Sequence, residues 1–243
     1  MLPPDWGVVK RCFTPACQCR RDLTPWHGVA VLKGVFPGGR FGVFAGCGLL
    51  YAGLSAAMVA IVMLAGVRTP VWPADAVVVA LLVNRPAGDR LVGVAGALMG
   101  WFLFAWYRGG DAHFLVSILF VRALSMGVGL WAIDLVRTWA ERSHNEELFE
   151  VVAALTAAIF APLASLALAF LLSRAGTLRN APMSLGVWWG GGTAAFAIFL
   201  PALLYLQRDA ARLGQRPDWL NGWVFVAVVL VFSAGAVAAT ATL

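Results

Sequence analysis

Long apolar runs, separated by short polar segments, dominate the chain after Arg40. A helix needs about 20 mostly apolar residues to cross the hydrocarbon layer of a bilayer. The pattern therefore predicts an all-α, polytopic membrane bundle of about seven transmembrane helices. We expect these helices at residues 41–66, 72–84, 91–107, 114–136, 149–172, 185–206 and 222–239.

The first forty residues lack such a run and are rich in Pro, Gly and aromatic residues. We expect residues 1–40 to form a cytoplasmic or interfacial arm and residues 41–243 to form the bundle. The arm contains Cys12, Cys17, Cys19 and His27, but their spacing does not match the usual zinc patterns. We therefore predict no metal site.

The second apolar run begins in an unusual way. Trp72 suits a membrane interface, Pro73 suits a first helical turn, and Asp75 falls near the positive end of the helix dipole. The run ends at Asn84, so the helix is short for a full crossing. The pattern leaves open whether it is tilted, thins the bilayer or is re-entrant.

Other runs carry local signals. Small residues at Gly42-x-x-x-Gly46 and Gly96-x-x-x-Gly100 let neighbouring helices approach closely. The fourth helix should continue as a polar helix through Arg137 and Glu141, an opposite-charge pair at i,i+4. Ser143 to Glu146 resembles a capping box for the fifth helix, and Asp218 could cap the seventh.

Only 12% of the residues are charged, about half the share in soluble proteins. The net charge of +6 is spread between apolar runs without a basic, aromatic-interleaved face, so nucleic acid is not expected as a partner. With the N-terminus inside, thirteen of the eighteen Lys and Arg fall on the inner side. The positive-inside rule thus predicts a cytoplasmic N-terminus and an outer C-terminus.

Arg122 is a charge placed within an apolar run. A charge near the centre of a membrane helix costs about 2.5–3.5 kcal/mol, so it normally has a partner. Asp75 is the expected partner, because both helices should run inward and place the two groups at similar depth. The pair could be a structural ion pair that sets the register of the helices, or it could be part of a ligand-sensing site.

Trp188 and Trp189 lead directly into three glycines, Gly190 to Gly192, and Pro201 follows. This helix is weakened twice, so we expect it to be broken or bent. Exposed backbone groups there could line a ligand pocket that includes Gly191, or could serve close helix packing. Asp134 is expected simply to reach the inner interface.

The chain lacks the residues that several classes of membrane protein and enzyme require. The two lysines precede the first span, which argues against retinal, and the three histidines lie outside or at the ends of spans, which argues against haem. No Ser/His/Asp set, zinc-protease motif or P-loop occurs. Asp75 and Asp134 are expected near opposite faces, which disfavours an aspartate pair. We predict no catalytic residues and no cofactor.

Several short motifs occur in an order that resembles a known family. The chain is similar to the first class of membrane-associated sensor domains (MASE type), found at the N-termini of bacterial histidine kinases and cyclic-di-GMP enzymes. The motifs are Val71-Trp72-Pro73-Ala74, Val77–Leu82, Phe160–Ser165, Trp188-Trp189-Gly190 and Leu200–Leu204. Family members tend to carry one more helix and an output domain, so the resemblance implies either a shortened relative that signals through a partner or a relative recruited for another purpose.

The resulting expectation is a sensory input module of the bacterial inner membrane. It would bind a small or lipidic ligand between the second, fourth and sixth helices, at Trp72, Asp75, Arg122, Trp188, Trp189 and Gly191. Its partners would be membrane lipids and a signalling kinase or diguanylate cyclase, or other membrane proteins, and it could be an oligomer. The first alternative is an accessory subunit of a larger membrane complex. The second, a solute transporter, is disfavoured because no internal repeat is visible.

Overall fold

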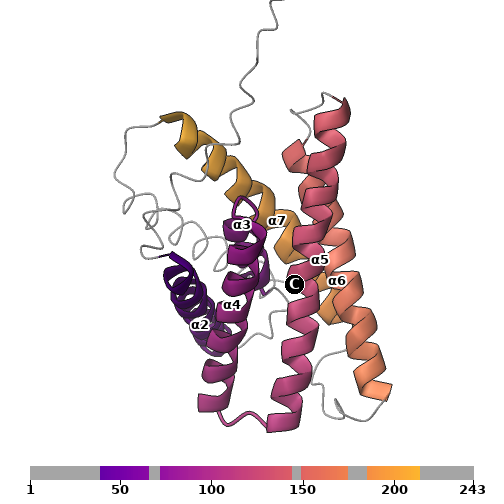
Figure 1. The fold of residues 1–243 in the computed structure, drawn as a ribbon. Coiled ribbons are helices and arrows are strands. Elements are labelled where there is room, and N and C mark those ends of the chain that lie inside the picture. Colours follow the sequence, from indigo (N-terminus) through magenta and orange to yellow (C-terminus); the bar gives the residue numbers. More distant parts are fainter. Residues whose placement is uncertain (1–38, 66–71, 144–148, 175–184, 214–243) are drawn as a thin grey trace, which may run out of the picture.

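The computed structural model describes residues 39–65, 72–143, 149–174 and 185–213. In these ranges every regular element is an α-helix, which confirms the predicted all-α class (Figure 1). The helices are α2 (Gly39–Ala65), α3 (Ala74–Leu82), α4 (Ala87–Tyr107), α5 (Ala112–Ser143), α6 (Phe149–Arg174) and α7 (Leu185–Leu213). The expected arm with its cysteines, most of the capping box, Asp218 and the run 222–239 lie outside the described residues.

Four of these helices are long and apolar enough to cross a membrane. They are Gly39–Leu64, Ala87–Tyr107, Ala112–Arg142 and Phe149–Arg174, and α7 adds a shorter apolar stretch, Trp189–Tyr205. Many large apolar side chains on these helices point outward, among them Phe41, Leu64, Phe120 and Trp131. An outer surface of this kind suits lipid rather than water, so the chain is a multi-pass membrane protein.

Two expectations about single helices have clear outcomes. The fourth predicted helix does continue beyond the apolar run, because α5 extends without interruption to Ser143. Of the two forms expected for the sixth helix, broken or bent, the break is wrong: α7 is one continuous helix across Gly190–Gly192 and Pro201. Packing of buried side chains such as Phe196 and Leu200 holds α7 together where its intrinsic propensity is weak.

The helices form two packed groups, which are joined by α3 and by direct contact between α4 and α5. In one group α2 packs on α4, and in the other α5 packs on α6 and α6 on α7. Helix α3 contacts α2, α4, α5 and α7, and Figure 1 shows it amid the longer helices. With nine residues it is only about 13 Å long, less than half of the hydrocarbon thickness. The prediction of a short second helix is confirmed.

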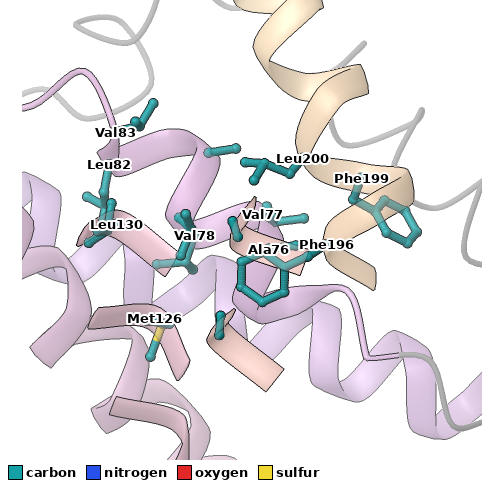
Figure 2. Close-up of a cluster of buried hydrophobic side chains, with 14 of the residues drawn as sticks. Ala76, Val77, Val78, Leu82, Val83, Met126, Leu130, Phe196, Phe199 and Leu200 are labelled. Carbon is teal, nitrogen blue, oxygen red and sulfur yellow. The ribbon is translucent and has the colours of Figure 1, made fainter. Parts of the chain in front are cut away.

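Helix α3 is the centre of the apolar core. Eight of its nine side chains are buried, all except Asp75. Val77 and Val78 pack with Met126 of α5 and with Phe196 and neighbouring residues of α7 (Figure 2). Since lipid is as apolar as these side chains, close van der Waals packing rather than exclusion of water stabilises such an arrangement within a bilayer.

Glycines allow α2 and α4 to cross at backbone contact. A Cβ on Gly96 would overlap the carbonyl oxygen of Phe44, and one on Gly100 would overlap that of Gly48. The matching order of these two pairs means that α2 and α4 run parallel. The predicted Gly96-x-x-x-Gly100 interface is confirmed, although its partner glycine on α2 is Gly48 rather than Gly42 or Gly46.

We expect Gly100→Ala to lower the free energy of unfolding by about 1–3 kcal/mol, because the added methyl group has no room beside the Gly48 backbone. Gly53→Ala is the matched control, since nothing lies within 4 Å of a Cβ there. Alanine favours a helix over glycine by about 1 kcal/mol, so the control should be neutral or stabilising. Unfolding midpoints in detergent measure both, and equal midpoints would contradict the crossing.

Candidate functional site

The predicted partner of Arg122 is confirmed. Its Nη1 lies 3.0 Å from Oδ1 and 3.1 Å from Oδ2 of Asp75, and both side chains are 13% exposed. The Tyr51 hydroxyl of α2 donates a hydrogen bond to the same Oδ1 atom. Asp75 occupies the first turn of α3, where the helix dipole favours a carboxylate. Three helices thus meet at one carboxylate.

Three aromatic rings surround the Arg122 guanidinium. Its Cζ lies 5.1 Å from the ring centroid of Trp72, 5.7 Å from that of Trp101 and 5.9 Å from that of Tyr51. Cation–π attraction contributes up to about 2 kcal/mol when the cation is desolvated. We call Tyr51, Trp72, Asp75, Trp101 and Arg122 the Arg122 cluster. Its rings and its carboxylate together compensate a charge removed from water.

Two polar atoms of the Arg122 cluster have no hydrogen-bond partner among the described residues. They are Nε of Arg122 and Nε1 of Trp72, and both are buried. An unsatisfied buried donor costs about 1–3 kcal/mol. These two N–H groups could therefore donate to an additional acceptor. For this reason the cluster is the candidate functional site.

The structure assembles part of the predicted ligand-binding set. Trp72, Asp75 and Arg122 lie together, as described above. Trp189 is 39% exposed, Gly191 is buried, and the adjacent Gly192 packs against Pro162 of α6. The side chain of Trp188 lies outside the described residues, so a part for α7 in ligand binding stays a prediction.

Sequence reasoning missed the contributions of α2 and α4. Tyr51 is fully buried and Trp101 is 6% exposed, and both face the guanidinium. The available signal was one tyrosine within the otherwise apolar run of α2 and a tryptophan one residue after Gly100. Neither residue is unusual in a membrane helix, so only the packing of the helices identifies them.

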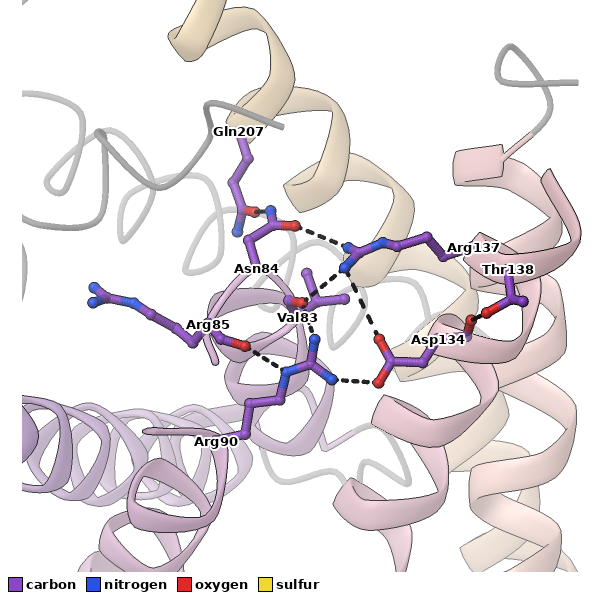
Figure 3. A network of polar contacts seen from close by, with 8 residues as sticks. All are labelled: Val83, Asn84, Arg85, Arg90, Asp134, Arg137, Thr138 and Gln207. Atoms are coloured by element: carbon purple, nitrogen blue, oxygen red, sulfur yellow. Dashed lines mark hydrogen bonds and ion pairs between the residues drawn. The ribbon is translucent and has the colours of Figure 1, made fainter. Parts of the chain in front are cut away.

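A second polar cluster lies at the other end of α3 (Figure 3). Arg90 pairs with Asp134, and Nη2 of Arg137 donates to Asn84 Oδ1 at 2.9 Å. Nδ2 of Asn84 in turn donates to Gln207 Oε1 at 3.1 Å. Asp134, expected to extend only to the interface, is 44% exposed and binds these arginines. Arg137 lies against Asn84 and Asp134, in place of the expected pairing with Glu141.

These side chains cap the end of α3. Carbonyl oxygens in the last turn of a helix lack intrahelical donors. Nε2 of Gln207 donates to the carbonyl of Ala80 at 2.9 Å, and Nη2 of Arg90 donates to that of Val83 at 2.7 Å. Nε of Arg90 also donates to the carbonyl of Arg85 at 2.8 Å. Each nitrogen of Arg90 thus has an acceptor, whereas Nε of Arg137 has none among the described residues. The hydrogen bonds to the carbonyls of Ala80 and Val83 make this cluster a structural cap.

The two clusters are well separated. The twelve residues of α5 from Arg122 to Asp134 correspond to about 18 Å. The buried side chains of α3, such as Val78 and Val79, lie between them. Asp75 and Asp134 therefore belong to different polar layers. In the described ranges no group of three or more His, Cys, Asp or Glu residues could hold a metal ion.

Comparison of the chain with models of protein families, with curated proteins and with solved structures gives no match.

We expect Asp75→Ala and Arg122→Ala each to lower the free energy of unfolding by about 3–5 kcal/mol, since each leaves a buried charge unpaired. The double variant should lose less than the sum, with a coupling of about 0.5–3 kcal/mol. Combining Asp75→Ala with Arg108→Ala is the control, because Arg108 is exposed and should contribute additively. Additive losses for Asp75 and Arg122 would contradict the pair.

Proposed function

We propose that this protein is a sensory input module of a bacterial inner membrane, which binds a small or lipidic ligand at the Arg122 cluster and signals through a partner protein. The observation that carries the proposal is a buried ion pair with two unpartnered donors inside a bundle of apolar helices. Buried charges in membrane helices are costly and are typically found at functional sites. The resemblance to membrane-associated sensor domains points in the same direction.

The geometry offers a way to couple binding to helix position. The Asp75–Arg122 pair joins the first turn of α3 to α5, whereas the capped end of α3 is tied to α4, α5 and α7. A ligand that binds Nε of Arg122 and Nε1 of Trp72 adds contacts at one end of α3 and leaves the other end unchanged. Occupancy then favours one of two arrangements of α3 and α5, provided that the ligand binds them with different affinities.

We also propose about seven spans, with a cytoplasmic N-terminus and an outer C-terminus. The parallel course of α2 and α4 supports alternation through the short α3. Arg90 and Arg137 gather at the end of the bundle where Arg40 pairs with Asp89, a surplus of positive charge that favours the cytoplasmic side.

Cysteine labelling in intact cells tests this orientation. In a background with the four native cysteines replaced by alanine, a membrane-impermeant maleimide should label Arg108→Cys from outside. Ala87→Cys should react only after permeabilisation, because the start of α4 is predicted to face the cytoplasm. Both positions are exposed in the structure, so a difference in labelling reports the side of the membrane and not burial of one cysteine. Labelling of Ala87→Cys in intact cells would overturn the orientation.

Affinity capture from native membranes tests the signalling function. A sensor module should bring down a histidine kinase or a diguanylate cyclase, and Arg122→Gln should change the recovered amount at least threefold. Arg108→Gln is the charge-matched control and should leave the recovery unchanged. Recovery of other membrane proteins in fixed stoichiometry, whatever residue stands at position 122, would instead favour an accessory subunit.

A further inference from the structure

We propose that the ligand of the Arg122 cluster is a neutral, lipid-soluble carbonyl compound of the quinone type. This inference rests on the proposed function, because it names the ligand class of the same site. Three properties of the cluster lead to it: its unsatisfied donors, its balanced charge and its aromatic surfaces.

The unsatisfied atoms are both donors. Nε of Arg122 and Nε1 of Trp72 each carry an N–H group, and among the described residues neither makes a hydrogen bond of normal geometry, although the Tyr51 hydroxyl lies near both side chains. Asp75 is already engaged by Nη1 of Arg122 and by the Tyr51 hydroxyl. A ligand that fits must therefore supply acceptor oxygens, and a ligand that offers only donors would leave both groups unsatisfied.

The charge of the cluster is already balanced. Arg122 contributes one positive charge and Asp75 one negative charge, and both side chains are 13% exposed. A carboxylate or phosphate ligand would add a net negative charge in a medium of low dielectric constant, which is costly without a further cation. A neutral acceptor, such as a carbonyl oxygen, satisfies the donors without that cost.

The aromatic rings favour a flat, apolar ligand body. Trp72 precedes α3, Trp101 belongs to α4, and both rings lie beside the guanidinium. Aromatic side chains pack well against another planar ring in offset-stacked or edge-to-face contact. Quinones combine a planar ring, two carbonyl oxygens and no charge, and they dissolve in the bilayer that surrounds these helices.

Binding of three probes to the full-length protein in lipid nanodiscs tests the assignment. The probes have alkyl tails of nine or ten carbons: decylubiquinone, decylbenzene, which has no acceptor oxygen, and decanoate, which is an anion. We expect saturable binding of decylubiquinone at least tenfold tighter than of the other two. Equal binding of decylbenzene, tighter binding of decanoate, or no saturable binding of decylubiquinone would each overturn the inference.

Variants then locate the site. Trp72→Phe keeps an aromatic ring but removes the unpartnered N–H, so affinity for decylubiquinone should fall about three- to tenfold. Trp131→Phe makes the same change at a tryptophan that is 57% exposed on α5 and should leave the affinity unchanged. Unfolding midpoints within 2 °C of the parent, no more than the shift that about 1 kcal/mol produces, show that both variants fold. Equal affinities of folded Trp72→Phe and the parent would overturn the inference.

The capture experiment and the quinone-binding experiment can fail independently of each other. Quinone binding without capture of a kinase or cyclase removes the signalling function and leaves the ligand class in place. Capture that depends on Arg122, without quinone binding, removes the ligand class alone.

Discussion

The backbone at the two ends of α3 imposes the constraint on which the rest of the bundle depends. A helix of nine residues packs among four longer helices, and the backbone groups at its ends need hydrogen-bond partners from the protein wherever water does not reach them. At its start, Asp75 provides a negative charge beside the free amide groups of the first turn. At its end, Arg90 and Gln207 donate to carbonyl oxygens. A short helix is possible here only because other helices supply these groups.

Each charge introduced for this purpose requires a partner of its own. Asp75 is neutralised by Arg122, and Arg90 by Asp134. The result is two polar layers about 18 Å apart, separated by the densely packed side chains of α3 and α7. The two layers differ in degree. Every nitrogen of Arg90 has an acceptor and Arg137 leaves one buried donor, its Nε, without a partner in the described part of the chain, whereas the Arg122 cluster leaves two.

The sequence predicted much of this arrangement where a single strong physical effect decides the outcome. Apolar runs located the helices, and the cost of a charge in a membrane identified Arg122 and its partner. The cap at the end of α3 was not predicted, because Arg90, Arg137 and Gln207 look like ordinary interfacial residues until the packing of four helices is known. The predicted break in α7 failed for a related reason, since tertiary packing overrides the low helix propensity of Gly190–Gly192.

The cap also joins parts of the chain that the ribosome synthesises at different times. Gln207 and the carbonyl of Ala80 are 127 residues apart, and ribosomes add about 5–20 residues per second. For several seconds or more after α3 emerges, α7 has not yet been synthesised, so the last turn of α3 lacks the hydrogen bond from Gln207. Nine residues, of which eight are apolar, are too few to be inserted as an independent span. Biogenesis therefore has to hold α3 in a provisional position, beside α2 and α4, until the later helices arrive and enclose it.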